Sequence, residues 1–107
     1  MGWFDILRGP GMDQGVQECR ETPGGVLLDV RTPEEYRAGH VPGSRNVPLD
    51  QLSRIGEAAP GKDAPLFVYC HSGARSRQAV GVLRRMGYEN VRNIGGIANY
   101  RGEVEYR

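Results

Sequence analysis

The 107-residue sequence has little cysteine, few aromatic residues and no excess of charge of either sign. It contains two cysteines, Cys19 and Cys70, whereas a small secreted domain held by disulfides usually carries several pairs. We therefore expect reduced thiols and a cytoplasmic protein. The formal net charge is +1, which provides no overall field for binding nucleic acid or a membrane surface.

Long apolar runs are also missing. No stretch approaches the roughly 18 apolar residues that a membrane-spanning helix needs. The first eight residues carry Asp5 inside a short apolar stretch, which is unlike a secretory signal. Glycine and proline at 9–11 break the chain, so we interpret 1–11 as an N-terminal segment of unassigned role. Trp3 and Phe4 are expected to fold back onto the body of the protein, and residues 12–107 form a single domain.

What the sequence does contain is an alternation of predicted strands and helices. Apolar runs predict buried strands over 26–30 and 66–69, with shorter strands over 45–47 and 91–94. Helices are predicted over 14–21, 33–38 and 50–59, and again after Cys70 up to Gly87. In that last helix one stripe is expected to face the sheet: Ala79, Val82, Leu83 and Met86. This order predicts an α/β fold with a parallel sheet and helices on both faces.

Three residues are predicted to cap helices. Thr32 precedes Pro33 and is followed three residues later by Glu35, the pattern of a capping box. Asp13 and Asp50 are expected to cap the helices that follow them.

The residues that carry chemistry follow the strand over 66–69. They are a cysteine and a small, polar loop: Cys70, His71, Ser72, Gly73, Ala74, Arg75 and Ser76. Gly73 tolerates positive φ, so the loop can curl with several amide N–H groups pointing inward at a helix N-terminus. Such a ring stabilises an anion, and a thiol at its centre is favoured as the nucleophilic thiolate. The alternative is a buried structural cysteine at the end of a strand.

Each polar side chain of this loop has two interpretations. Arg75 pairs with an incoming oxyanion through its forked guanidinium, or lies on the surface. His71 is a cationic neighbour of the thiol, or part of the rim. The hydroxyls of Ser72 and Ser76 donate to the bound sulfur, or cap the following helix.

Other polar residues are assigned structural roles. Asp29 and Arg31 end the strand over 26–30, and we expect an ion pair or a loop contact there. Cys19, His40, Cys70 and His71 lack the paired spacing of a zinc site, so no metal site is predicted.

These motifs, taken in order, resemble the rhodanese family of sulfurtransferases in its single-domain form. The resemblance runs from about Val26 to Tyr100. The matching stretches are Leu28-Asp29-Val30-Arg31, Glu34-Glu35-Tyr36, 39–44 with 46–49, 68–76, and Gly95-Gly96. Two features depart from the family pattern. Tyr100 stands where the family often has Trp, and the tail over 101–107 is short.

The resemblance implies a fold, a reaction and a site. The fold is a three-layer one, with a central, mostly parallel, five-stranded sheet flanked by helices on both faces. The reaction is transfer of sulfane sulfur through a Cys70 persulfide, from thiosulfate or a similar donor to cyanide, a thiol or a thiol-bearing protein. Residues 71–75 form the loop that cradles the sulfur, with Ser76 at its end. No cofactor is implied, and the oligomeric state is left open.

Two alternatives use related architecture. Phosphatases and arsenate reductases of the cysteine-loop kind place arginine six positions after the cysteine, where this chain has Ser76, and Arg75 comes one residue earlier. A shorter loop is sized for one sulfur atom, not for a tetrahedral oxyanion. A non-catalytic module on the same fold, for binding, regulation or sulfur carriage to a protein partner, is the second alternative, because a fold does not fix a function.

Overall fold

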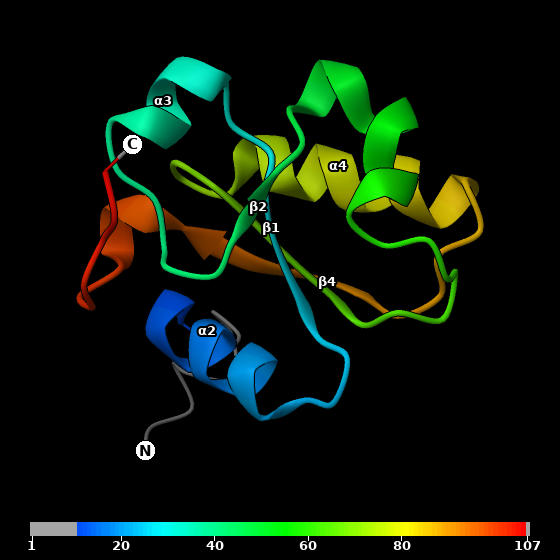
Figure 1. The fold of residues 1–107 in the computed structure, drawn as a ribbon, viewed down its shortest axis with the longest axis horizontal. Helices are drawn as coiled ribbons and strands as arrows, with labels where there is room; N and C mark the ends of the chain where they lie inside the picture. The colour runs from blue at the N-terminus through cyan, green and yellow to red at the C-terminus, as the bar shows by residue number, and fades with distance from the viewer. Residues whose placement is uncertain (1–10, 107) are drawn as a thin grey trace.

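A single sheet of four parallel strands organises the protein, in the order β2-β1-β3-β4. The computed structural model describes residues 11–106. Along the chain (Figure 1) the elements are α2 (Met12–Glu21), β1 (Val26–Asp29), α3 (Pro33–Arg37), β2 (Arg45–Asn46), the 3-10 segment η1 (Leu49–Glu57), β3 (Leu66–Cys70), α4 (Ala74–Arg85), β4 (Val91–Gly96) and η2 (Ile97–Asn99).

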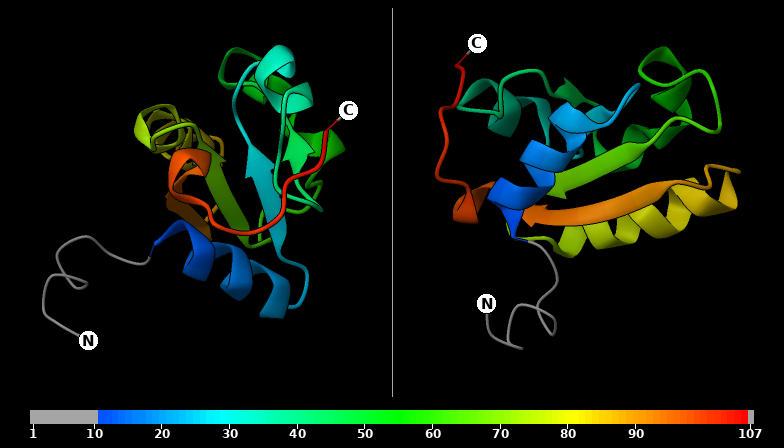
Figure 2. Two further views of the ribbon diagram at one scale, coloured as in Figure 1. Left: turned by 90° about the vertical axis from the view of Figure 1, so that its left-hand side faces the viewer. Right: turned by 90° about the horizontal axis from the view of Figure 1, so that it is seen from below.

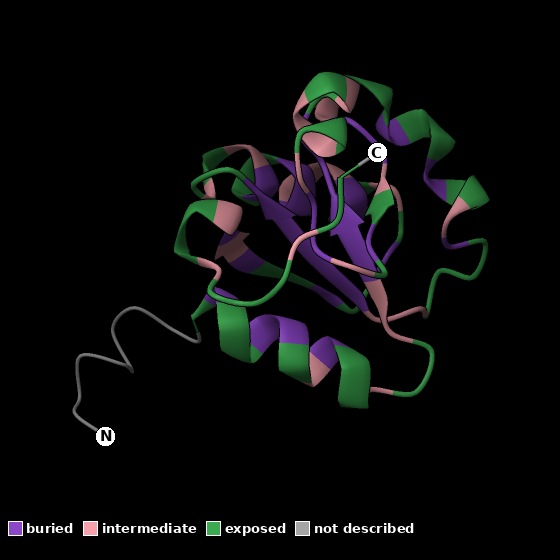
Figure 3. Cartoon of the chain, turned by 60° about the vertical axis from the view of Figure 1, so that its left-hand side comes forward, coloured by how far each residue is buried: buried purple, intermediate pink, exposed green. Residues whose placement is uncertain are grey.

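The sheet is covered on both faces, which gives three layers. In Figure 1, α2 lies below the sheet, and α4 with η1 lies above it, and the views in Figure 2 show the same arrangement. All five residues of β3 are buried, as an apolar run in a central parallel strand predicts. Figure 3 shows these strands as the buried centre of the molecule, with exposed surface on the outer sides of the helices. The predicted α/β architecture is therefore confirmed.

Alternation along β3 sends its side chains into two separate cores. Leu66, Val68 and Cys70 join the cluster under α4 and η1, together with Leu83 and Ile55. Phe67 and Tyr69 join the cluster under α2, with Met12, Val16, Cys19 and Ile94. The two cysteines consequently lie on opposite faces of the sheet.

Helix α4 is rotated slightly from the predicted stripe. Ala79 and Leu83 are buried as expected, whereas Val82 and Met86 are half-buried. The other buried positions are Ser76 and Val80. The first turn of α4 explains the difference, because Ser76 is fully enclosed between the Cys70 loop and β4 and turns this face of the helix inward.

One of the three predicted caps is correct. The Thr32 hydroxyl accepts from the Glu35 amide, and the Glu35 carboxylate accepts from the Thr32 amide, so the capping box is present. Asp13 and Asp50 do not cap. Helix α2 begins earlier than predicted, with Gly11 as its N-cap, and the Asp13 carboxylate accepts from the amide of Arg101 instead.

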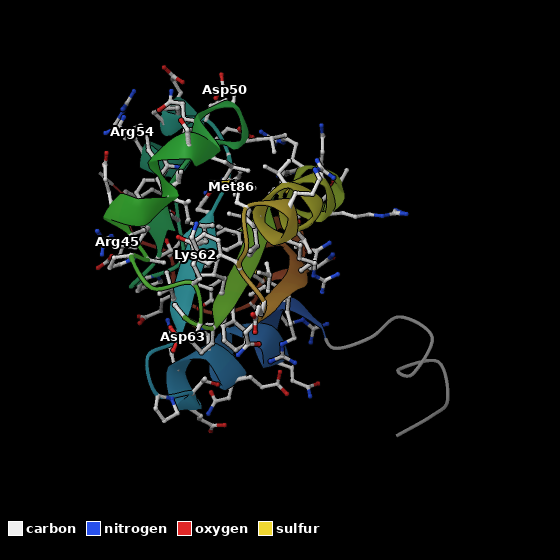
Figure 4. The ribbon with its side chains drawn as sticks, turned by 90° about the vertical axis from the view of Figure 1, so that its right-hand side faces the viewer. Arg45, Asp50, Arg54, Lys62, Asp63 and Met86 are labelled. Carbon is white, nitrogen blue, oxygen red and sulfur yellow. The ribbon has the colours of Figure 1, made fainter. Side chains whose placement is uncertain are left out.

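The second failed cap has the same cause. Segment η1 begins after Pro48, so Asp50 lies within the first turn with an exposed side chain at the outer surface of η1 (Figure 4).

Figure 4 also shows Lys62 near Met86, at the end of α4 away from Cys70. There the Lys62 amine donates to the Met86 carbonyl at 3.0 Å and lies 4.6 Å from the centre of the Tyr88 ring.

The expected fifth strand is not found among residues 11–106, which form four strands. The remaining extended pairing there is a single antiparallel bridge between His40 and Glu105. It joins the short tail to the loop after α3 through backbone hydrogen bonds in both directions, at 2.9 and 2.8 Å. A single bridge makes no ladder, so this contact fixes the tail without extending the sheet.

Two sequence predictions fall at the N-terminus. The expected segment 1–11, with Trp3 and Phe4, lies outside the described residues except for Gly11. Within the part of the chain that is described, no helix combines the length and apolar character needed to cross a bilayer.

Candidate active site

Cys70 is the last residue of β3, and its side chain points toward the N-terminal turn of α4. The residue is buried, with 1% of its surface exposed. The loop that follows brings amide groups to the sulfur. The Gly73 amide lies 3.0 Å from Sγ and the Ser76 amide 3.4 Å from it. The sulfur is therefore enclosed by donors, which distinguishes it from a structural cysteine surrounded only by apolar side chains.

Gly73 makes this curl possible. Its φ of +107° lies in the left-handed region, where a residue with a side chain would be strained. This conformation turns the chain from the strand into α4 within a few residues and directs the Gly73 amide at the sulfur. The sequence prediction of a curled loop with inward amides agrees with this geometry.

These contacts determine the acidity of the Cys70 thiol. Burial raises its pKa, but the hydrogen bond between the thiol and the Ser76 side chain and the hydrogen bonds from the amides of Ser76, Gly73 and Ser72 lower it. The net effect is a pKa below the ordinary thiol value. Hydrogen bonds to the charged form of a group favour ionisation. The site thus favours the nucleophilic thiolate.

Ser76 is part of the site through its side chain as well as its amide. Its Oγ accepts from the Cys70 thiol at 3.5 Å and donates to Asn93 Oδ1 at 2.7 Å. The residue has no exposed surface. The two interpretations given to this serine are a donor to the sulfur and a helix cap. The structure differs from both, because the hydroxyl contacts the sulfur as an acceptor and the N-cap position of α4 is occupied by Gly73.

Arg75 is held by a carboxylate from a distant part of the chain. Its two terminal nitrogens lie 2.7 and 2.9 Å from the two carboxylate oxygens of Glu35, a bidentate pair. The pair is partly exposed, at 36% for Arg75 and 35% for Glu35. The hydrogen bond from Arg75 lowers the pKa of Glu35 to about 2. The sequence predicts an Arg75 guanidinium that pairs with an incoming oxyanion. In the structure this guanidinium is already paired with Glu35.

The remaining loop side chains form the outer surface of the site. His71, Ser72 and Ala74 are exposed. An open hollow beside the loop is lined by Ser72, Gly73, Ala74, Arg77, Asn93, Ile94 and Gly95. Exposure places His71 at the rim, the second of its two interpretations. Ligands approaching from outside meet this surface first.

Asp29 and Arg31 form the expected structural contact. The buried Arg31 guanidinium lies 2.7 Å from the Asp29 carboxylate and donates to the Gly39 carbonyl at 2.7 Å. The pair joins the end of β1 to the loop after α3, and so supports the helix that carries Glu35.

Strand β4 contributes residues that sequence reasoning did not assign to the site. A register shift between Val68 and Tyr69 marks a bulge in β4, so that Gly95 and Gly96 lie opposite Tyr69 and Cys70. A Cβ at Gly96 would lie 2.0 Å from the His71 carbonyl oxygen. Bulges near active sites redirect local side chains. Gly96 is therefore explained by the close passage of β4 beside the loop, and Gly95 by its φ of +107°, which lies in the left-handed region.

Residues 11–106 contain no group of three or more His, Cys, Asp or Glu side chains placed to hold a metal ion. Both cysteines are free, and they lie in separate cores. The predicted site residues 70–76 do come together, whereas Cys19 and His40 are elsewhere in the fold. Glu35 and Asn93 join the site without having been assigned to it. Glu35 was visible in the sequence only as half of a capping box.

Comparison with known proteins places this geometry in a family. The family model described as "Rhodanese-like domain" matches residues 13–103. The chain belongs to the rhodanese family. Its most similar relatives include the thiosulfate sulfurtransferase PspE of Escherichia coli, which is 45% identical over 71 residues, covering 65% of this chain and 68% of PspE.

Other members of the rhodanese family extend the comparison. The putative sulfur carrier protein YrkF of Bacillus subtilis is 32% identical over 80 residues, which cover 74% of this chain but 43% of YrkF. Among solved structures, a rhodanese with anions from E. coli superposes with a TM-score of 0.72 at 38% identity, covering 77% of this chain and 98% of that one. The family match over residues 13–103 includes all four strands and the Cys70 loop.

Proposed function

We propose that this rhodanese-family sulfurtransferase carries sulfane sulfur on Cys70 as a persulfide. The observation that carries the proposal is the ring of amides around a thiol whose acidity is increased. Thiosulfate, or a donor with the same sulfur–sulfur bond, is the proposed donor, and cyanide, a small thiol or a protein thiol is the acceptor. The similarity to PspE supports the donor class, and that to YrkF supports a protein acceptor.

The first step forms the persulfide. The Cys70 thiolate attacks the outer sulfur of thiosulfate, a new sulfur–sulfur bond forms, and the donor's own sulfur–sulfur bond breaks. Sulfite leaves with the bonding electron pair, and the negative charge of the thiolate moves to the outer sulfur of the persulfide. No oxidant or metal is required for this exchange. The amides of Gly73 and Ser76 stabilise the charge throughout, because they are already directed at the sulfur.

The second step empties the site. The acceptor's nucleophile attacks the outer sulfur of the persulfide and takes it, and the electron pair of the broken bond returns to Cys70 as thiolate. Dividing one transfer into two displacements is covalent catalysis. The residues proposed to bind the donor are His71, Ser72, Gly73, Ala74, Arg75 and Ser76, with backbone amides as the main contacts.

Arg75 has a secondary part in this proposal. One N–H of each terminal nitrogen is directed at Glu35, and the guanidinium has further N–H groups for an approaching anion. The Glu35 carboxylate offsets its charge, so we assign recognition of the anion chiefly to the amides.

The test is the mass of the intact protein after incubation with thiosulfate. The wild type is expected to gain the mass of one sulfur atom and to lose it on addition of cyanide. Cys70→Ser is expected to gain nothing, and Cys19→Ser is the matched control that should still be loaded. A protein that never gains sulfur from any sulfane donor would support the non-catalytic module instead.

The cysteine-loop phosphatase is the other rival. Activity on an aryl phosphate together with no sulfur loading would support it. The loop geometry favours sulfur, since the arginine five positions after the cysteine pairs with Glu35 and the position six residues after it is a serine that contacts the sulfur. We also propose that the protein acts in the cytoplasm, because two cysteines are fewer than the disulfide framework of a small secreted domain usually has.

A further inference from the structure

Asn93 lies on β4, twenty-three residues after Cys70 in the sequence, and is exposed. Its neighbours on the strand, Arg92 and Ile94, face α2: Arg92 pairs with Glu18 at 2.7 Å, and Ile94 packs in the core under α2. Asn93 therefore belongs to the opposite face, on which the Cys70 loop and α4 lie.

Three hydrogen bonds connect the Asn93 amide to three different segments. Its Oδ1 accepts from the Ser76 hydroxyl at 2.7 Å and from the Gly95 amide at 2.9 Å. Its Nδ2 donates to the Gly73 carbonyl at 3.1 Å. The side chain thus uses both ends of its amide and joins β4 to the loop and to the first turn of α4.

Two of these partners are the residues whose amides lie within 3.4 Å of the sulfur. Gly73 supplies the contact at 3.0 Å and Ser76 the one at 3.4 Å. Gly73 has positive φ, and a glycine can also adopt many other backbone conformations. The loop must therefore be held in this one. A group that fixes both Gly73 and Ser76 from outside the loop restricts those alternatives.

We propose that Asn93 is a positioning residue that holds the Cys70 loop closed, with its amides directed at the sulfur. The inference rests on the proposed function for its catalytic consequence. Its structural part, that Asn93 acts on the ionisation of Cys70, can be tested without any sulfur donor.

The experiment compares Asn93→Ala with the wild type by titrating the Cys70 thiolate. Thiolate absorbance is recorded against pH, and the trace of the matching Cys70→Ser protein is subtracted to isolate Cys70. We expect the pKa of Cys70 to rise in Asn93→Ala, with about three- to tenfold less thiolate below that pKa, the size of one to two neutral hydrogen bonds. Persulfide formation should slow by a similar factor.

Two further variants make the test specific. Asn93→Asp keeps Oδ1 but replaces the Nδ2 donor with an oxygen that faces the Gly73 carbonyl, so the pKa of Cys70 should rise at least as much. Asn90→Ala, at an exposed asparagine just before β4, is the control and should titrate like the wild type. Circular dichroism of each variant checks that the fold is retained.

Three outcomes would overturn the proposal. An unchanged Cys70 titration in Asn93→Ala would show that the loop needs no external support. A lowered pKa would show that Asn93 competes with the sulfur for the Ser76 hydroxyl. Wild-type behaviour of Asn93→Asp would show that the bond to Gly73 is dispensable. Failure of the wild type to take sulfur from thiosulfate would instead refute the proposed function and leave this titration valid.

Discussion

Cys19 and Cys70 are both buried and both free, yet the pKa values of their thiols are shifted in opposite directions. Burial raises the pKa of Cys19 to about 11, although Arg20 and Arg92 act to lower it. Burial also raises that of Cys70, but there the hydrogen bonds from the loop outweigh it and the net pKa is lowered. Arginines lie near both thiols. The hydrogen bonds that Cys70 makes with the Ser76 side chain and with the loop amides therefore account for the difference.

A sulfur site in this fold requires backbone amides that are free to point at the thiol. Cys19 lies in helix α2 among apolar side chains, where the neutral thiol behaves as a small apolar group. Cys70 lies where a strand ends and a helix begins, and there amides without helical partners are available. The position of a cysteine relative to helix ends thus matters more than its exposure.

Replacing the nucleophile is expected to have the largest effect on sulfur transfer. Cys70→Ser is expected to reduce sulfur transfer by on the order of 10⁴-fold or more, as loss of a covalent nucleophile does. A thiosulfate–cyanide assay with folded protein measures it. Turnover close to that of the wild type would transfer the catalytic assignment to Cys19 or to no cysteine.

The next effect concerns the space beside the loop. In Gly96→Ala the new Cβ would lie 2.0 Å from the His71 carbonyl oxygen, so the loop or β4 must move. We expect about 1–3 kcal/mol lower free energy of unfolding, from urea denaturation, and loss of most sulfur transfer. Gly56→Ala, where a Cβ meets nothing within 4 Å, is the control. Equal behaviour of the two variants would contradict the close passage of β4.

The two thiols should also differ in their reaction with iodoacetamide. Both cysteines are buried, with 5% of Cys19 and 1% of Cys70 exposed, so solvent access would not make Cys70 the faster-reacting thiol. We expect peptide mass spectrometry to find Cys70 modified at a pH below the ordinary thiol range and Cys19 unmodified there. Because the pKa of Cys19 is about 11, its rate of modification in folded protein should still rise with pH where the rate of Cys70 has levelled off. Equal rates at neutral pH would remove the distinction.

A smaller effect tests whether arginine charge or amides select the donor. Glu35→Gln keeps a side-chain oxygen for the capping box and removes the charge that offsets Arg75. We expect the KM for thiosulfate to fall about two- to fivefold, the size of an exposed pair worth up to about 1 kcal/mol. The KM for an uncharged donor should not change.

Glu34 provides the matched control for this prediction. It lies on the same helix and pairs with Arg37 at 3.7 Å, with 79% of its side chain exposed. Glu34→Gln should leave both KM values unchanged. A raised KM for thiosulfate in Glu35→Gln would mean that Glu35 is needed to hold Arg75 in place for the donor.

The smallest effect is expected for Cys19→Ser, which should change sulfur transfer by less than about twofold, because Cys19 lies in the other core, away from the site.

The same variant should differ from the wild type in its stability at high pH. The folded pKa of Cys19, about 11, is above its ordinary value of 9.0, so the wild type loses stability as pH rises between them. Chemical denaturation at several pH values should show part of this loss disappearing in Cys19→Ser. Its full persistence would contradict the raised pKa.

The features that the sequence predicts correctly depend on contacts between residues that are close together in the chain. The curl of the loop follows from Gly73 and its small neighbours, and the capping box follows from Thr32 and Glu35, all within a few residues. Asp13 is no cap because α2 already begins at Met12, and its carboxylate instead meets the amide of Arg101, eighty-eight residues away. Such a contact leaves no trace in local spacing.

The parts of the site that could not be predicted come from other segments. Arg75 meets Glu35 across forty residues, and Ser76 meets Asn93 across seventeen. The loop sequence predicts the donors around the sulfur but not the groups that hold them. The resemblance to rhodaneses predicted the layered fold, while its five strands exceeded the four seen in residues 11–106.

The placement of Cys70 at the end of β3 has a kinetic consequence. Its strand is buried and held by β1 on one side and β4 on the other, so the cysteine has no swinging arm with which to visit a second pocket. Both exchange partners must come to the same immobile atom, and each must leave before the other arrives. Double-reciprocal plots at several acceptor concentrations should therefore give parallel lines.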